Sequence, residues 1–343
     1  MRRKDSIEVR RRTVLAGLGA GLGAGLLPGR LAAEAGQRVA LVMVGSISDG
    51  GWNQLAYEGL TDLEAGGFDT AYVENLTQAR IPEVVRGYAD DGFDLIIGHG
   101  FEFGSAFTEI APEYPDQKFF ATTFQAEAEP IDNLQFVNLA YLAAAYAAGA
   151  LAALISENGK AVGFIGGGDN PTQQAMNRAF IGGAESTVEG LRGLGVVTGD
   201  YNNAAKGKEA ALTMIGNGAD VIWHAADVTG LGAIQGAAGA GAKVIGCYAN
   251  QTALAPDRMA TSFLLNLRWM VGELGRTLAA DEFAGGTEWN PSVKSLWVPV
   301  YGEAEPLSAF NPALVDADAQ AKFEAIFADL EAGKIDLSAF QGS

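Results

Sequence analysis

The first chemically informative stretch places an aromatic ring beside polar side chains. Residues 45–54 read GSISDGGWNQ. Trp52 can stack on a flat ligand while Asp49 and Asn53 hydrogen-bond its edge, and the two glycines between them give a ligand access to the backbone. The structural alternative is a helix start with its tryptophan tucked into the core. We favour the binding interpretation because of the glycines.

A second aromatic and carboxylate pair follows much later in the chain. Residues 220–230 read DVIWHAADVTG and contain Trp223 and Asp227. If the two stretches face each other, Trp52 and Trp223 can cover opposite faces of one planar ligand. A base stacked on an aromatic side chain gains roughly 1–3 kcal/mol. The alternative, in which Trp223 ends a buried strand, stays open.

The only two histidines, His99 and His224, also follow expected strands. Neither an HExxH pattern nor a cysteine pair accompanies them, so we expect hydrogen-bonded loop residues and no metal or other cofactor. Phe101 lies in the loop after His99. Gly166 opens the stretch GGGDNP, which lacks the spacing of a phosphate loop and instead predicts a tight turn into a helix. No catalytic arrangement is evident, so we expect a binding protein and not an enzyme.

These loops lie between alternating strand-like and helix-like segments, which is typical of parallel sheets covered by helices. Ligands of such sheets bind beyond the carboxyl ends of the strands. The pattern runs through about five strands, meets the acidic stretch 125–132 and starts again, which predicts two lobes with a cleft. We expect a first lobe of residues 36–124 plus 251–290, and a second of 125–250 plus 291–343. The expected strands are 39–44, 71–73, 95–97, 118–121, 134–137, 161–165, 196–198, 221–223, 244–246 and 259–263.

Residues 1–35 have the plan of an export signal. A basic start with the pair Arg11 and Arg12 precedes an apolar run and a small-residue end, which indicates twin-arginine export with cleavage after Ala35. No cysteine follows this signal, so we expect a periplasmic protein without a lipid anchor.

The net charge and the cysteine count limit the partners and the covalent links that the chain can have. The formal charge of the chain is −18, and removal of residues 1–35 makes it −22. Nucleic acid is excluded as a partner because phosphate binding needs a basic face. The single cysteine, Cys247, permits no intrachain disulfide, and we expect it to be buried at a strand end.

Five motifs in order carry a family resemblance: DGGWNQ at 49–54, IGHGF at 97–101, APEYPD at 111–116, VGFIGG at 162–167 and GADVIW at 218–223. They resemble the basic membrane protein (PnrA-like) family of ABC transporter substrate-binding proteins. The resemblance implies a type I periplasmic binding fold, with two doubly wound parallel-sheet lobes joined by three crossings. It also implies a purine nucleoside as ligand and an ABC permease as partner.

The chain departs from the family pattern where the family binds sugar hydroxyls. Thr122 and Thr123 stand where an aspartate is frequent, residues 246–251 read GCYANQ in place of GVDxDQ, and Phe263 replaces a lysine. A nucleobase or another flat heterocycle therefore fits better than a ribonucleoside.

The resulting prediction is a monomeric periplasmic receptor that closes by hinge motion on a purine-like ligand. The alternatives are a ligand-binding module of a membrane sensor and a periplasmic enzyme exported in folded form. The predicted ligand-binding residues are Asp49, Trp52, Asn53, His99, Phe101, Thr123, Gly166, Trp223, Asp227, Tyr248 and Asn250.

Overall fold

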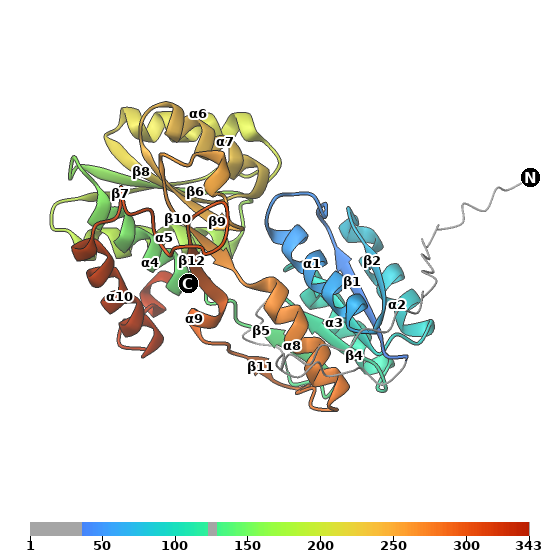
Figure 1. Cartoon of the computed structure of the whole chain (residues 1–343). Coiled ribbons are helices and arrows are strands. Elements are labelled where there is room, and N and C mark those ends of the chain that lie inside the picture. Colours follow the sequence, from blue (N-terminus) through green and yellow to red (C-terminus); the bar gives the residue numbers. More distant parts are fainter. Residues whose placement is uncertain (1–35, 123–128, 343) are drawn as a thin grey trace, which may run out of the picture.

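The computed structural model describes residues 36–122 and 129–342, which form two α/β lobes side by side (Figure 1). Each lobe contains a six-stranded sheet, in the orders β11-β5-β4-β3-β1-β2 and β12-β10-β9-β8-β6-β7. Strand pairing is parallel throughout both sheets except between β10 and β12. The prediction of two doubly wound parallel-sheet lobes is confirmed.

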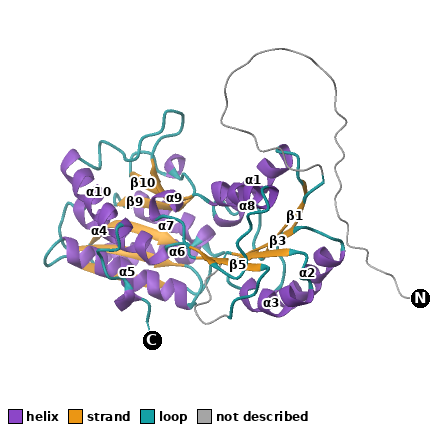
Figure 2. Ribbon diagram, turned by 90° about the horizontal axis from the view of Figure 1, so that it is seen from below, coloured by secondary structure: helices purple, strands orange, loops and turns teal. Residues whose placement is uncertain are grey.

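The elements of the first lobe are β1 (Arg38–Met43), α1 (Trp52–Ala65), β2 (Asp69–Val73), α2 (Ile81–Asp90), β3 (Leu95–His99), α3 (Phe103–Ile110), β4 (Lys118–Ala121), β5 (Leu134–Val137), α8 (Leu267–Ala279) and β11 (Glu288–Trp289). Helices α1 and α8 cover one face of the sheet, and α2 and α3 cover the other (Figure 2). Two separate apolar clusters fill the two faces.

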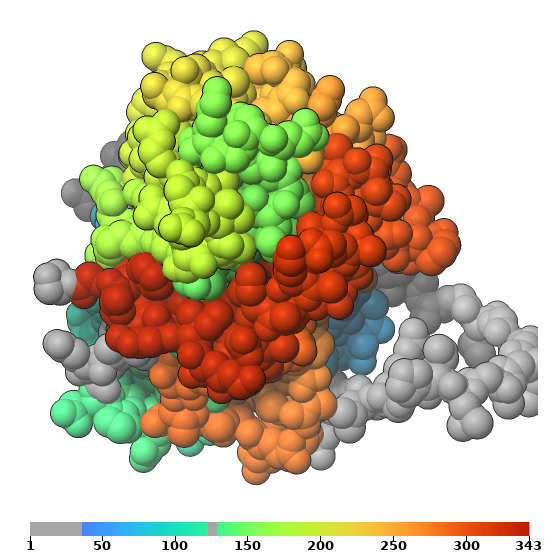
Figure 3. Space-filling model, turned by 90° about the vertical axis from the view of Figure 1, so that its left-hand side faces the viewer, coloured from blue at the N-terminus to red at the C-terminus, as the bar shows by residue number. Residues whose placement is uncertain are grey.

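The elements of the second lobe are α4 (Tyr141–Ile155), β6 (Ala161–Gly166), α5 (Pro171–Thr187), β7 (Arg192–Val197), α6 (Ala204–Gly216), β8 (Ala219–Ala225), α7 (Asp227–Gly239), β9 (Lys243–Tyr248), β10 (Met259–Leu265), α9 (Val293–Leu296), β12 (Trp297–Val300) and α10 (Ala317–Glu331). The C-terminal segment lies against this lobe (Figure 3). No helix in the described ranges is long and apolar enough to cross a membrane.

The predicted lobe boundaries need two corrections. Strand β5 belongs to the first sheet, where Leu134 pairs with Phe119 of β4, so the chain does not cross over in the acidic stretch. Strand β10 belongs to the second sheet, where Phe263 pairs with Cys247 of β9. The chain therefore crosses between the lobes after β5, after β10 and after β11. The acidic stretch predicted the boundary between the lobes at the wrong position, because strand pairing and not charge decides which sheet a strand joins.

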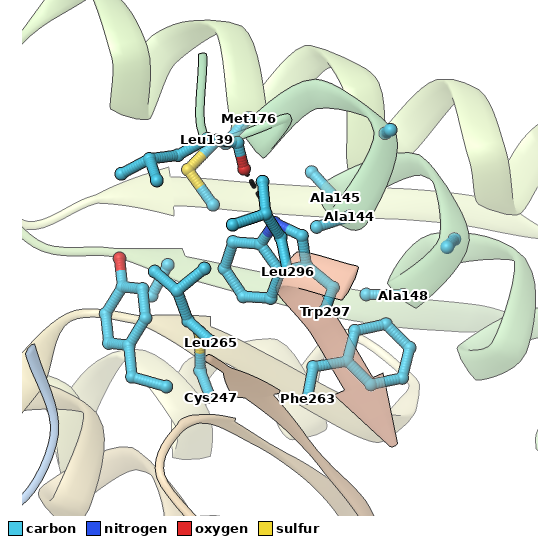
Figure 4. Close-up of a cluster of buried hydrophobic side chains, with 14 of the residues drawn as sticks. Leu139, Ala144, Ala145, Ala148, Met176, Cys247, Phe263, Leu265, Leu296 and Trp297 are labelled. Atoms are coloured by element: carbon cyan, nitrogen blue, oxygen red, sulfur yellow. Dashed lines mark hydrogen bonds between the residues drawn. The ribbon is translucent and has the colours of Figure 1, made fainter. Parts of the chain in front are cut away.

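A buried indole joins two of these crossings. Trp297, at the start of β12, donates its Nε1–H to the carbonyl of Leu139, which follows β5, at 2.7 Å (Figure 4). Its ring lies in the apolar core with Cys247, Phe263 and Leu265. The burial of Cys247 at the end of β9 agrees with the sequence prediction.

Candidate functional site

The loop before α1 is held by the carboxylate of Asp49. Its Oδ1 accepts the backbone N–H groups of Gly51 (2.9 Å) and Gln54 (3.1 Å), and its Oδ2 accepts the backbone N–H (2.8 Å) and side-chain Nδ2–H (2.8 Å) of Asn53. These amides belong to the start of a helix, where they have no carbonyl partner. Asp49 therefore organises the turn that presents Trp52. Asn53 keeps one free acceptor, since its buried Oδ1 has no hydrogen-bond partner among the described residues.

Trp52 lies flat against His99. The two ring centroids are 4.1 Å apart with 19° between the planes, and His99 Nε2 lies 3.0 Å from the carbonyl oxygen of Trp52. A carbonyl only accepts, so Nε2 carries the proton and Nδ1 accepts from the hydroxyl of Thr122 at 3.1 Å. Burial lowers the pKa of His99 to about 4, so the ring is neutral. His99 is therefore a support for Trp52, and it agrees with the expected hydrogen-bonded loop histidine.

Aromatic rings of the second lobe approach Trp52 from across the interface. The Tyr248 centroid lies 5.9 Å and the Tyr141 centroid 6.3 Å from that of Trp52. Tyr248 ends β9 with φ of +69°, and a Cβ added to Gly51 would lie 3.3 Å from the Tyr248 Cβ. The two lobes thus touch at this point through aromatic rings and glycine backbone.

Asp227 lies at the start of α7 and contributes a carboxyl group to the same region. Its Oδ1 is buried and has no hydrogen-bond partner in the part of the chain that the structure describes. Burial, together with the charge of Asp49 from the other lobe, raises the pKa of Asp227 to about 8. The carboxyl group is therefore mostly protonated at neutral pH. The backbone of Asp227 has a φ of +45°, a conformation that Asp and Asn adopt more readily than most residues.

The structure corrects the prediction for Trp223. Its side chain is 0 % exposed and packs against Phe180, with centroids 5.9 Å apart and planes at 16°, and against Phe164 at 5.2 Å. Both faces of β8 are buried, and Trp223 lies on the face that it shares with Val221 and Ala225, two residues before the strand ends. Trp223 is therefore not the second wall of the site. The structural alternative, a tryptophan in a buried strand, is the correct one.

Comparison with known proteins decides the family. A model of the family "ABC transporter substrate-binding protein PnrA-like" matches residues 36–324. The chain belongs to this family. Basic membrane protein A of Borreliella afzelii is 27% identical over 272 residues, which are 78% of this chain and 83% of that protein. A purine-binding protein of Brucella abortus is 28% identical over 240 residues, which are 69% of this chain and 67% of that protein.

A solved structure supports the same conclusion. The ABC transporter solute-binding protein from Conexibacter woesei is 25% identical, with a TM-score of 0.70 over 89% of this chain and 99% of that one. The fold of this PnrA-like protein is thus that of the type I periplasmic solute-binding proteins. The family description and this solved structure both name solute-binding proteins of ABC transporters.

The other ligand-binding residues predicted for this PnrA-like protein differ in their exposure and hydrogen bonding. Phe101 is 56 % exposed in the loop after β3. Gly166 is buried at the end of β6. Asn250 is occupied locally, because its Nδ2 donates to the carbonyl of Gly302 and its Oδ1 accepts from Thr252. Its amide is therefore not free for a ligand. Thr123 and the export signal lie outside the described residues.

Two aromatic residues of this region were missed from the sequence. Tyr141 begins α4, directly after the first crossing. Tyr201 covers the glycine turn after β6 so closely that a Cβ on Gly167 would clash with its ring. The Tyr201 hydroxyl accepts a hydrogen bond from Asn170 Nδ2 at 3.0 Å. Only the order of the strands reveals their proximity to Trp52 and Asp227.

Proposed function

We propose that this PnrA-like protein binds a small planar, purine-like ligand, a nucleobase or nucleoside, between its lobes. It then delivers the ligand to the permease of an ABC importer. We place it in the periplasm as a monomer without a lipid anchor. The main support is the position of Trp52, which is braced by neutral His99 and faces the rings of Tyr141 and Tyr248 from the other lobe. The purine-binding relative adds weight to the choice of ligand class.

Hinge motion is part of this proposal. A flat ligand stacked on both faces needs its neighbouring rings about 7 Å apart, twice a van der Waals contact of about 3.5 Å. The centroids of Trp52 and Tyr248 are 5.9 Å apart, with 58° between their planes, so a ligand cannot enter between them in this arrangement. The lobes must open to admit it. Closure around the ligand then gives a permease a shape that distinguishes the loaded protein.

The test is calorimetric titration of the exported protein with adenine, adenosine and uracil, followed by the Trp52→Ala variant. Loss of one stacking surface should weaken binding by roughly 5- to 150-fold, which corresponds to about 1–3 kcal/mol. Trp269→Ala is the matched control, since Trp269 contacts Trp289 in the first lobe and has no ring contact with Trp52. Equal effects of the two substitutions, or binding unchanged in Trp52→Ala, would contradict the proposed site.

A further inference from the structure

Among the described residues, the titratable groups that interact with Asp227 are acidic or neutral. Asp49 raises its pKa from the first lobe, and Asp227 in turn raises the pKa values of Tyr141, Tyr201, Cys247 and Tyr248. These groups come from the loop before α1, the start of α4, the loop after β7 and the end of β9. None is a lysine or arginine. Burial also keeps His99, which stacks on Trp52, neutral, so this histidine supplies no positive charge.

A buried carboxyl oxygen without a partner is costly, and proteins normally satisfy such groups. Oδ1 of Asp227 has no hydrogen-bond donor among the described residues, and the charged group that shifts its pKa, Asp49, is negative. Tyr141, Tyr201 and Tyr248 lie close enough for Asp227 to raise their pKa values, and the electron-rich faces of aromatic rings attract positive charge. Carboxyl and rings together form an environment that favours a cation over an anion.

We propose that the ligand is a flat nitrogen heterocycle that carries a positive charge, and that Asp227 is its ionic partner. This inference rests on the proposed function and specifies the ligand class of the same site. The charge of Asp49, which acts on Asp227 from the first lobe, disfavours nucleotides and other anionic heterocycles. Binding the cation converts Asp227 from the protonated to the ionised form and releases its proton to solvent.

The proton release makes the affinity depend on pH. With a pKa of about 8, Asp227 is about 1 % ionised at pH 6 and half ionised at pH 8. Affinity for a permanent cation should therefore rise about 50-fold between pH 6 and pH 8 and level off above pH 9. A neutral ligand that accepts from the protonated carboxyl should instead bind less tightly above pH 8. The sign of the pH dependence separates the two cases.

The experiment uses N-methylquinolinium, a permanent flat cation, and quinoline, its neutral counterpart, with adenine as reference. We expect N-methylquinolinium to bind more tightly than quinoline at pH 8, and its affinity to rise about 50-fold from pH 6 to pH 8. At pH 7 its binding should release about one proton from Asp227, which titrations in buffers of different ionisation enthalpy measure. Asp227→Asn should abolish the preference and the pH effect. Asn is compatible with the positive φ, and a thermal melt checks that the variant is folded.

The control Asp169→Asn removes an exposed carboxylate of the same lobe, which accepts from Gln174, and should leave all affinities unchanged. Equal binding of N-methylquinolinium and quinoline at pH 8, or a pH effect that survives in Asp227→Asn, overturns the inference. If adenine still binds in a Trp52-dependent manner in that case, the proposed function stands without it. If neither adenine nor N-methylquinolinium binds to the folded protein, both are wrong.

Discussion

Replacing Asp227 with Asn should stabilise the ligand-free protein, and the gain should grow with pH. The folded protein holds the Asp227 proton up to about pH 8, whereas an unfolded chain releases it near the ordinary aspartate pKa of about 3.9. Between these values folding takes up a proton, so the free energy of unfolding falls by about 1.4 kcal/mol for each unit of rising pH. Asn does not titrate and escapes this loss.

The magnitude follows from the two pKa values. Between pH 6 and pH 8 the wild type should lose about 2 kcal/mol relative to the variant, and above pH 9 the difference should become constant. For a chain of this length 1 kcal/mol corresponds to about 2 °C in Tm. The Tm advantage of Asp227→Asn should therefore increase by about 4 °C from pH 6 to pH 8.

Differential scanning calorimetry of both proteins at pH 6, 7 and 8 measures this. Comparing the two at each pH cancels every other titrating group, and Asp169→Asn controls for the loss of an exposed carboxylate. A Tm difference that does not change with pH would show that Asp227 is ionised in the folded protein. A variant less stable than wild type at every pH would show that the carboxyl has a partner that Asn cannot replace. Either result refutes the reasoning about Asp227.

Two further substitutions separate structural from ligand-contacting residues. Asp49→Ala removes the acceptor of three backbone amides at the start of α1 and should lower the free energy of unfolding by about 1–2 kcal/mol. A thermal melt detects this loss, and an unchanged Tm would contradict the capping role of Asp49. Trp223→Ala should cost about 3–5 kcal/mol, because the indole is buried among phenylalanines, while ligand affinity measured well below the Tm stays within twofold. A Trp223→Ala protein of normal stability that no longer binds would restore Trp223 to the site.

The architecture was predictable because it depends on local patterns. Short apolar runs separated by helical segments specify parallel sheets, and the loops at their carboxyl ends include those that carry Trp52, His99 and Asp227. The lobe boundary was not predictable from composition, since only pairing with β4 assigns β5 to the first sheet. The local sequence pattern thus specifies the helices and strands, and long-range strand pairing specifies the sheet to which each strand belongs.

The details of the site depended on facts that a linear sequence does not contain. Strand β8 continues to Ala225, so Trp223 lies inside a strand that is buried on both faces and not in the loop beyond it, and residue type alone could not decide where the strand ends. The rings that do meet Trp52 belong to Tyr141 and Tyr248, from separate elements of the other lobe. Asp49 was predicted to contact the ligand, but its carboxylate accepts backbone amides at the start of α1. A carboxylate beside glycines suits both roles.

These contacts also determine which interaction sets the affinity. The rings of Trp52 and Tyr248 lie 5.9 Å apart across the interface, so a ligand that stacks between them replaces this ring contact and gains only the difference. Asp227 Oδ1, by contrast, has no partner among the described residues until a ligand supplies one. An interaction that is gained contributes more than one that is exchanged. Discrimination among flat ligands should therefore depend on the group that they present to Asp227 more than on the area of their rings.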